Sequence, residues 1–264
     1  MQGIADYQFL RPVVEGSRGS VYLAVPPARL GLDCAHVGVK VVVGPTSEDS
    51  LRRATRELRA FASAQSPFLV KLLDAGQQDG TFFYSMEYCQ LGSLAQPARP
   101  LSRAEVVVAV AQAARAAHAL HEAGLVHRSI KPANILLRDD GARLSDLGLV
   151  QTLSPGQTIT GFGPVGDVEF VEPSILLGQP GSRASDVWSL GATLHRAITG
   201  DGIYGELPAD DPLLCIRRVL GNRPRLSSRL SGADAEVIGR CLAVAAADRP
   251  RDALSLAQEL EKLH

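Results

Sequence analysis

The sequence predicts an α+β protein built from a strand-rich segment followed by a helix-rich one. Up to about residue 88, β-branched and alternating apolar runs dominate, whereas helical spacing of apolar residues takes over beyond that point. Internal repeats and low-complexity tracts, which would indicate another organisation, are absent from the sequence. We therefore expect a single domain over residues 1–264, with one lobe over 1–88 and a second over 89–264.

The first lobe is expected to contain five strands and one helix. The strands are apolar or alternating runs bounded by Gly, Pro and polar residues, and they cover residues 7–14, 20–25, 36–44, 68–76 and 81–89. A helix is expected from about Ser47 to Gln65, because Glu48 and Asp49 suit a helix N-terminus and apolar residues recur at helical spacing up to Phe61.

The second lobe is expected to be mainly helical. Ser102 and Glu105 form a capping-box pattern ahead of a helix that runs to Gly124. Further helices are expected at residues 185–199, 233–243 and 252–263. Residues 151–182 are rich in Gly, Pro, Ser and Thr and are expected to form a long loop.

Composition excludes several classes of function. The 27 basic and 28 acidic residues leave a net charge of −1, which argues against a nucleic-acid binder that works through bulk positive charge. No apolar window is long enough for a membrane span, and the N-terminus lacks a signal-peptide pattern. Four cysteines without a C-x-x-C pair suggest free thiols in a reducing compartment. Only four basic residues are lysines, namely Lys40, Lys71, Lys131 and Lys262.

Two features of the first lobe are ambiguous when taken alone. Gly16 and Gly19 lie between two expected strands, where glycines let a backbone close over phosphates but equally form an ordinary hairpin turn. Lys40 lies in an expected strand and Glu57 on the following helix. This pair fits either a functional ion pair or a simple surface salt bridge.

The centre of the chain resolves that ambiguity. His-Arg-Ser-Ile-Lys-Pro-Ala-Asn at residues 127–134 is followed by Ser-Asp-Leu-Gly at 145–148, and Asp-Val-Trp-Ser-Leu-Gly at 186–191 and Arg-Pro at 249–250 come later. This order strongly resembles the eukaryotic-type (Hanks-type) serine/threonine protein kinases over essentially the whole chain. The resemblance implies a two-lobe kinase fold with a five-stranded antiparallel sheet. Lys131, Trp188 and Arg249 favour the protein kinases over small-molecule kinases of the same fold.

The resemblance implies ATP and Mg²⁺ as ligands and gives each motif residue a role. Lys40, partnered by Glu57, would hold the α- and β-phosphates, and Asn134 and Asp146 would hold Mg²⁺. Lys131 would neutralise charge on the transferring phosphoryl group. The other nucleotide-binding positions are Gly16, Gly19, Val21, Met86 at the gatekeeper, Glu87 and Cys89 at the hinge, and Leu136. His127 and Leu147 would be packing residues.

The sequence departs from the family at the position of the catalytic base. Ser129 replaces the aspartate that accepts the substrate hydroxyl's proton, and losing a positioned base typically slows a reaction by ~10²–10⁴. Val14 stands in place of the first loop glycine, and Gly38 in place of an alanine over adenine. The family's Ala-Pro-Glu reads Glu-Pro-Ser at residues 172–174, so Arg249 is expected to lose its glutamate partner.

A second change accompanies the loss of the base. Asp167 occupies the position where the family carries a threonine beside the catalytic aspartate, so hydroxyl and carboxylate have exchanged places. We expect Asp167 to point into the vacated site and to pair with Lys131. Either this is a salt bridge that keeps an inactive site ordered, or Asp167 is a relocated base, which would need hydrogen-bond reach to the nucleophile.

The sequence therefore predicts a nucleotide-binding pseudokinase that acts as a signalling or scaffold module with a protein partner. The alternative is a slow serine/threonine kinase that relies on Asp167 or on substrate positioning. An engineered inactivation is a third alternative, which the additional changes at 14, 167, 172 and 174 argue against. The Arg- and Ala-rich, Lys-poor composition indicates a bacterial source. We expect a cytoplasmic domain, either alone or as the cytosolic part of a longer protein.

Overall fold

The computed structural model describes residues 2–15, 19–42, 48–146, 165–208 and 211–263. The chain divides into two compact units. The first contains the described residues of Met1–Ser63 and Val70–Cys89, and the second contains those of Ala64–Leu69, Gln90–Gly148 and Thr158–His264. Within the described part, no helix combines the length and apolar character that a membrane span requires.

The first unit is built on a six-stranded antiparallel sheet in the order β1-β2-β3-β4-β6-β5. Its strands are β1 (Gly3–Ile4), β2 (Tyr7–Val14), β3 (Gly19–Val25), β4 (Val37–Val42), β5 (Leu72–Gln78) and β6 (Thr81–Glu87), and its helices are α1 (Glu48–Ser63) and the short η1 (Ala28–Leu30). The expected sheet had five strands. The sixth, β1, is only two residues long and therefore carries no periodicity that a sequence pattern could reveal.

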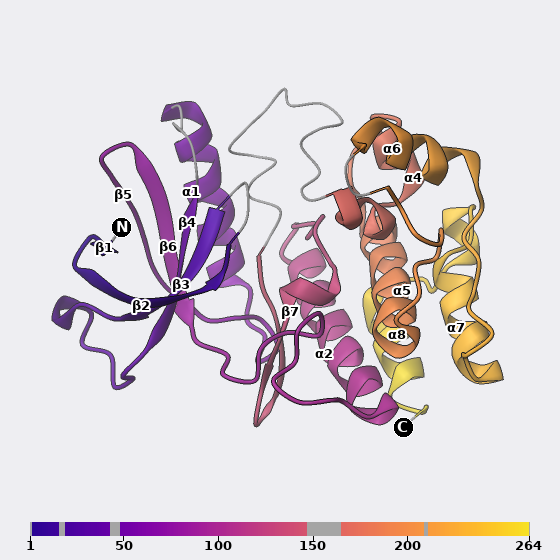
Figure 1. The fold of residues 1–264 in the computed structure, drawn as a ribbon, viewed down its shortest axis with the longest axis horizontal. Coiled ribbons are helices and arrows are strands. Elements are labelled where there is room, and N and C mark those ends of the chain that lie inside the picture. Colours follow the sequence, from indigo (N-terminus) through magenta and orange to yellow (C-terminus); the bar gives the residue numbers. More distant parts are fainter. Residues whose placement is uncertain (1, 16–18, 43–47, 147–164, 209–210, 264) are drawn as a thin grey trace. The chain divides into compact units, whose positions relative to one another are not determined.

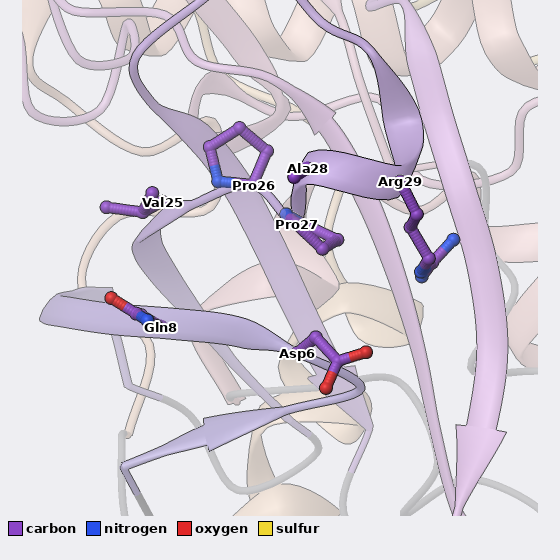
Figure 2. A pocket seen from close by; sticks show the side chains of 7 residues that line it. All are labelled: Asp6, Gln8, Val25, Pro26, Pro27, Ala28 and Arg29. Carbon is purple, nitrogen blue, oxygen red and sulfur yellow. The ribbon is translucent and has the colours of Figure 1, made fainter.

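Side chains link β2, near one edge of this sheet, to β5 and β6 at the other edge. The Tyr7 hydroxyl lies 3.1 Å from Asp74 Oδ2 and 2.7 Å from Ser85 Oγ, and the Arg29 guanidinium lies 2.6 Å from the same Asp74 oxygen. Burial raises the pKa of Tyr7 to about 12. An open pocket beside this linkage is lined by Asp6, Gln8, Val25, Pro26, Pro27, Ala28 and Arg29 (Figure 2). It contains none of the predicted site residues.

The second unit is mainly helical, as expected. It contains α2 (Arg103–Glu122), α4 (Pro173–Leu176), α5 (Arg183–Thr199), α6 (Pro212–Gly221), α7 (Gly232–Cys241) and α8 (Ala253–Leu260). A hairpin of β7 (Ile135–Arg138) and β8 (Gly141–Leu144) and the short helices η2 (Pro132–Asn134), η3 (Val165–Phe170) and η4 (Ala246–Asp248) complete it. Helices α2, α5 and α8 pack against one another (Figure 1). The predicted capping box of Ser102 and Glu105 begins α2.

Two parts of the second unit differ from the expectation. The long loop predicted over 151–182 lies partly outside the described residues, and from residue 165 onward it contains η3 and α4. The Gly- and Pro-rich composition of this segment predicted a loop, so these two short helices were missed. Val168 and Leu176 are buried and hold the helices in place. Helix α6 was also missed, although Asp211 caps it by accepting the Leu214 N–H and Pro212 opens it.

Candidate functional site

The segment between α2 and β7 is organised by one buried carboxylate. Asp186, in the first turn of α5, is fully buried and accepts the backbone N–H groups of His127 and Arg128 at 2.8 and 2.9 Å. Its Oδ2 also lies 2.8 Å from His121 Nε2. Arg128 adopts a positive φ of 66°, which turns the chain sharply just before Ser129. Helix α5 therefore fixes the conformation of the segment that carries the predicted site.

Ser129 and Asn134 are hydrogen-bonded to each other within this segment. Asn134 Nδ2 donates to the carbonyl oxygen of Ser129 at 2.7 Å and to its hydroxyl oxygen at 3.1 Å. The Asn134 side chain is buried, and the hydrogen bonds that it makes to Ser129 both use Nδ2. The amide is thus oriented with its carbonyl oxygen available, which suits the predicted role of a Mg²⁺ ligand.

Asp146 is brought to the same place by its neighbour Ser145. The backbone N–H and the hydroxyl of Ser145 both donate to the Asn134 carbonyl oxygen, at 2.9 and 3.1 Å. The buried ring of His127 lies 3.0 Å from the Ser145 carbonyl oxygen, and burial lowers the pKa of this histidine. Asp146 itself adopts a positive φ of 64°, a conformation that non-glycine residues adopt mainly where surrounding structure enforces it.

These residues fit a magnesium site that the nucleotide completes. Mg²⁺ in phosphoryl-transfer proteins takes one or two protein oxygens and fills its other positions with phosphate oxygens and water. Asn134 and Asp146 would supply those two oxygens. Across the described ranges, no group of three or more His, Cys, Asp and Glu side chains could hold a metal unaided.

Lys131 and Asp167 form an ion pair beside Ser129. Lys131 Nζ lies 2.6 Å from Asp167 Oδ2, and the two side chains are 19% and 20% exposed. The pairing expected from the sequence is therefore present. Among the described residues, Asp167 makes no hydrogen bond to Ser129, whose hydroxyl accepts from Asn134 instead.

The short helix η3, which carries Asp167, is fastened to α5 at two further points. Glu169 is buried and makes a two-pronged ion pair with Arg196, with both N–O distances at 2.8 Å. The Ser189 hydroxyl donates to the Phe170 carbonyl oxygen at 2.7 Å. The position of Asp167 is consequently set by its own contact with Lys131 and by the contacts of Glu169 and Phe170 with α5. The sequence reasoning did not identify Glu169 or Arg196, which lie 27 residues apart.

The expectation that Arg249 loses its carboxylate partner is wrong. Arg249 Nη2 lies 2.7 Å from Glu172 Oε1, and the two side chains are 1% and 13% exposed. The guanidinium also donates to the Ala184 and Ala243 carbonyl oxygens and lies 5.1 Å from the centre of the Trp188 ring. The glutamate has moved two residues earlier in the chain, and a comparison of motifs position by position overlooks such a shift.

The other predicted nucleotide-binding residues lie mostly on the sheet of the first unit. Val21 on β3 pairs with Lys40 on β4, and Gly38 pairs with Met86 on β6. An added Cβ at Gly38 would meet Met86 at 3.5 Å, an ordinary van der Waals contact, so the missing alanine methyl would fit. Glu57 lies on α1 and is partly buried.

The remaining residues of this set are distributed as follows. Gly19 opens β3 with φ +152°, and an added Cβ would lie 2.5 Å from the Val41 carbonyl oxygen, so this position requires glycine. Glu87 pairs with Val37, and Cys89 is buried just after β6. Leu136 lies on β7 in the second unit. Gly16 and Leu147 lie outside the described residues.

Comparison with known proteins agrees with this arrangement. The family model described as the protein kinase domain matches residues 7–259. The chain belongs to the protein kinase family. It is 34% identical over 265 residues to the serine/threonine-protein kinase PknK of Mycobacterium tuberculosis, covering 97% of this chain and 23% of that protein.

Other bacterial kinases show the same relationship. The probable serine/threonine-protein kinase pknA2 of Bifidobacterium longum is 29% identical, covering 97% of this chain and 35% of that protein. The DNA damage-responsive serine/threonine-protein kinase RqkA of Deinococcus radiodurans is 33% identical over 204 residues, or 74% of this chain and 30% of that protein. The chain thus spans between 23% and 35% of the length of these relatives. Its Hanks-type character and its likeness to bacterial kinases are established.

Proposed function

We propose that this kinase domain is a pseudokinase that binds ATP with Mg²⁺ and has lost most or all phosphoryl transfer. The proposal rests on the hydrogen bonds of the two side chains that could accept the proton of the substrate hydroxyl, Ser129 and Asp167. A serine hydroxyl that accepts a hydrogen bond from Asn134 stands at the base position, and the nearby carboxylate of Asp167 is paired with Lys131. Loss of a positioned base costs ~10²–10⁴ in rate, or roughly 3–5 kcal/mol of barrier.

Retention of nucleotide binding is supported by the groups that phosphates and Mg²⁺ require. The Asn134 amide is oriented by its hydrogen bonds to Ser129, and Lys40 lies on β4 opposite Val21 of β3. Gly19 keeps the backbone conformation that only glycine adopts readily. A chain under no demand to bind nucleotide would have little reason to retain these residues.

The output of such a domain would be conformational, because a ligand can bias the states of a protein without being turned over. The helices η3 and α4 remain anchored by Glu169–Arg196 and Glu172–Arg249, so the second unit can present an ordered surface to a protein partner. We place this signalling or scaffold role in the cytoplasm of a bacterium. None of the four cysteines, all of which lie in the described ranges, forms a disulfide, which suits a reducing compartment.

A second candidate is a slow serine/threonine kinase. The observation that favours it is the Asp167 carboxylate itself, which is held 2.6 Å from Lys131 within the catalytic segment. Positioning and electrostatics carry most of phosphoryl transfer, so a displaced carboxylate could support residual turnover. This candidate requires that Asp167→Ala abolish whatever transfer the wild-type chain shows.

Thermal unfolding with and without Mg·ATP tests the proposed binding. At a free concentration of 100 Kd, a ligand that binds only the folded chain adds ~2.7 kcal/mol of stability. For a chain of this size that corresponds to a rise in Tm of roughly 5–10 °C. We expect such a rise with Mg·ATP, and a smaller one for Asp146→Asn. An unchanged Tm over a wide range of Mg·ATP concentration would contradict nucleotide binding.

A further inference from the structure

The ammonium of Lys131 is the starting point for an inference that rests on the proposed nucleotide binding. The chain uses this group to bind a carboxylate of its own, Asp167, at 2.6 Å. Both side chains are about four-fifths buried, so the pair is only partly screened by water. Any other anion that approaches Lys131 must either share the ammonium with Asp167 or displace it.

The backbone leaves little room for the two partners to separate. Lys131 is extended, it is followed by Pro132, and its carbonyl oxygen accepts the Asn134 N–H at 3.0 Å. Asp167 lies on η3, where Glu169 and Phe170 are both fastened to α5. These contacts hold the Asp167 carboxylate near the site even if the Lys131 side chain turns away from it.

If nucleotide binds as proposed, the anion that would meet this pair is its terminal phosphate. Lys131 precedes η2 and Asn134 ends it, so the ammonium and the magnesium-ligand amide belong to one turn of chain. Asn134 would hold Mg²⁺, and the metal would neutralise charge on the phosphates of the nucleotide. A diphosphate can still use the metal, whereas a triphosphate adds a further dianionic group close to Lys131 and Asp167.

We propose that Asp167 is a specificity-determining residue that disfavours the γ-phosphate, so that this domain binds ADP at least as tightly as ATP. Asp167 acts in two ways. It occupies the ammonium that would otherwise contact the γ-phosphate, and it places a negative charge next to that phosphate. The charge of the nucleotide, rather than its turnover, then determines which nucleotide the domain binds more tightly.

Isothermal titration with Mg·ADP and with a magnesium complex of a non-hydrolysable ATP analogue tests this proposal without relying on activity. The variants are Asp167→Asn and Asp167→Thr, the latter restoring the residue type of the family. The matched control is Asp248→Asn, which removes an exposed carboxylate on η4 in the same unit. Asp167→Asn is expected to tighten triphosphate binding about tenfold, the scale of one partly screened like charge, and to change ADP binding less than about twofold.

A double-mutant cycle with Lys131→Gln separates the two effects of Asp167. If Asp167 acts partly by occupying the ammonium, Asp167→Asn improves triphosphate binding more in the presence of Lys131 than in its absence. Equal gains for ADP and the triphosphate, or no gain in both Asp167 variants, would overturn the inference while leaving nucleotide binding intact. Failure of every variant to bind either nucleotide would instead overturn the proposed function, and this inference with it.

Discussion

The ion pair between Glu172 and Arg249 offers a stringent test of how the second unit is held together. In this family the first residue of the Ala-Pro-Glu motif is alanine, so Glu172→Ala restores the family residue at that position while removing this chain's carboxylate. Arg249 would then keep a guanidinium that is 99% buried with no negative partner among the described residues. We expect the variant to fold but to lose considerable stability.

The size of this loss follows from the surroundings of Arg249. Removing one partner of a buried ion pair costs about 3–5 kcal/mol, because the remaining charge is buried without compensation. Arg249 still donates to the carbonyl oxygens of Ala184, Ala243 and Val244, which places the expected loss near the lower limit, at about 3 kcal/mol. This corresponds to a fall in Tm of roughly 6–12 °C.

Thermal and urea unfolding, followed by circular dichroism, provide the assay. The control is Glu122→Ala, whose partner Arg183 is exposed, with side-chain exposures of 62% and 54%, so the expected loss is below about 1 kcal/mol. Glu172→Ala combined with Ser174→Glu returns the carboxylate to the position where the family carries it and should recover at least half of the loss. A Glu172→Ala variant as stable as Glu122→Ala would refute the reasoning.

Three further predictions concern stability. Burial lowers the pKa of His127 and of His195, so the unfolded chain binds protons that the folded chain does not. The free energy of unfolding is therefore expected to be unaffected by these histidines above about pH 6.5 and to fall as the pH drops below that value. Urea midpoints measured from pH 7.5 to 5.5 would show this fall. Gly19→Ala should lower stability by about 1–3 kcal/mol, because its Cβ would lie 2.5 Å from the Val41 carbonyl oxygen, and Gly38→Ala, where the methyl fits, is its control in urea unfolding. Ser102→Ala should cost about 1 kcal/mol by removing the cap of α2, and Ser102→Asp should restore most of that loss in the same measurement.

Most elements of this fold were predictable where the sequence carries a long or capped periodic pattern, and α6, which Asp211 caps, is the exception. The β-branched run around Lys40 predicted the strand that the structure contains as β4, and the capping box at Ser102 predicted the start of α2. Short elements were not predictable, because they are held by contacts distant in the chain rather than by local pattern. Helix η3 is an example, since Glu169 and Phe170 are fixed by residues of α5.

The site shows the same division. Family motifs at fixed spacing predicted Asn134, Asp146 and Lys131 as candidate site residues, and the exchange of residue types at 129 and 167 predicted the Lys131–Asp167 contact, which is present. The partner of Arg249 was missed, because an ion pair depends on where a carboxylate ends in space, and Glu172 reaches the guanidinium from two positions earlier in the chain. A motif comparison records only which residue occupies each position.

The central claim, that the chain binds nucleotide but transfers phosphate poorly, is tested most directly by measuring γ-phosphate transfer from radiolabelled ATP. The wild-type chain would be compared with Ser129→Asp, alone and combined with Asp167→Thr, at concentrations where all variants are saturated with Mg·ATP. We expect the wild-type rate to lie at least ~10²-fold below that of the restored double variant. A wild-type rate equal to that of the restored variant, and abolished by Asp167→Ala, would contradict the account and identify Asp167 as a working base.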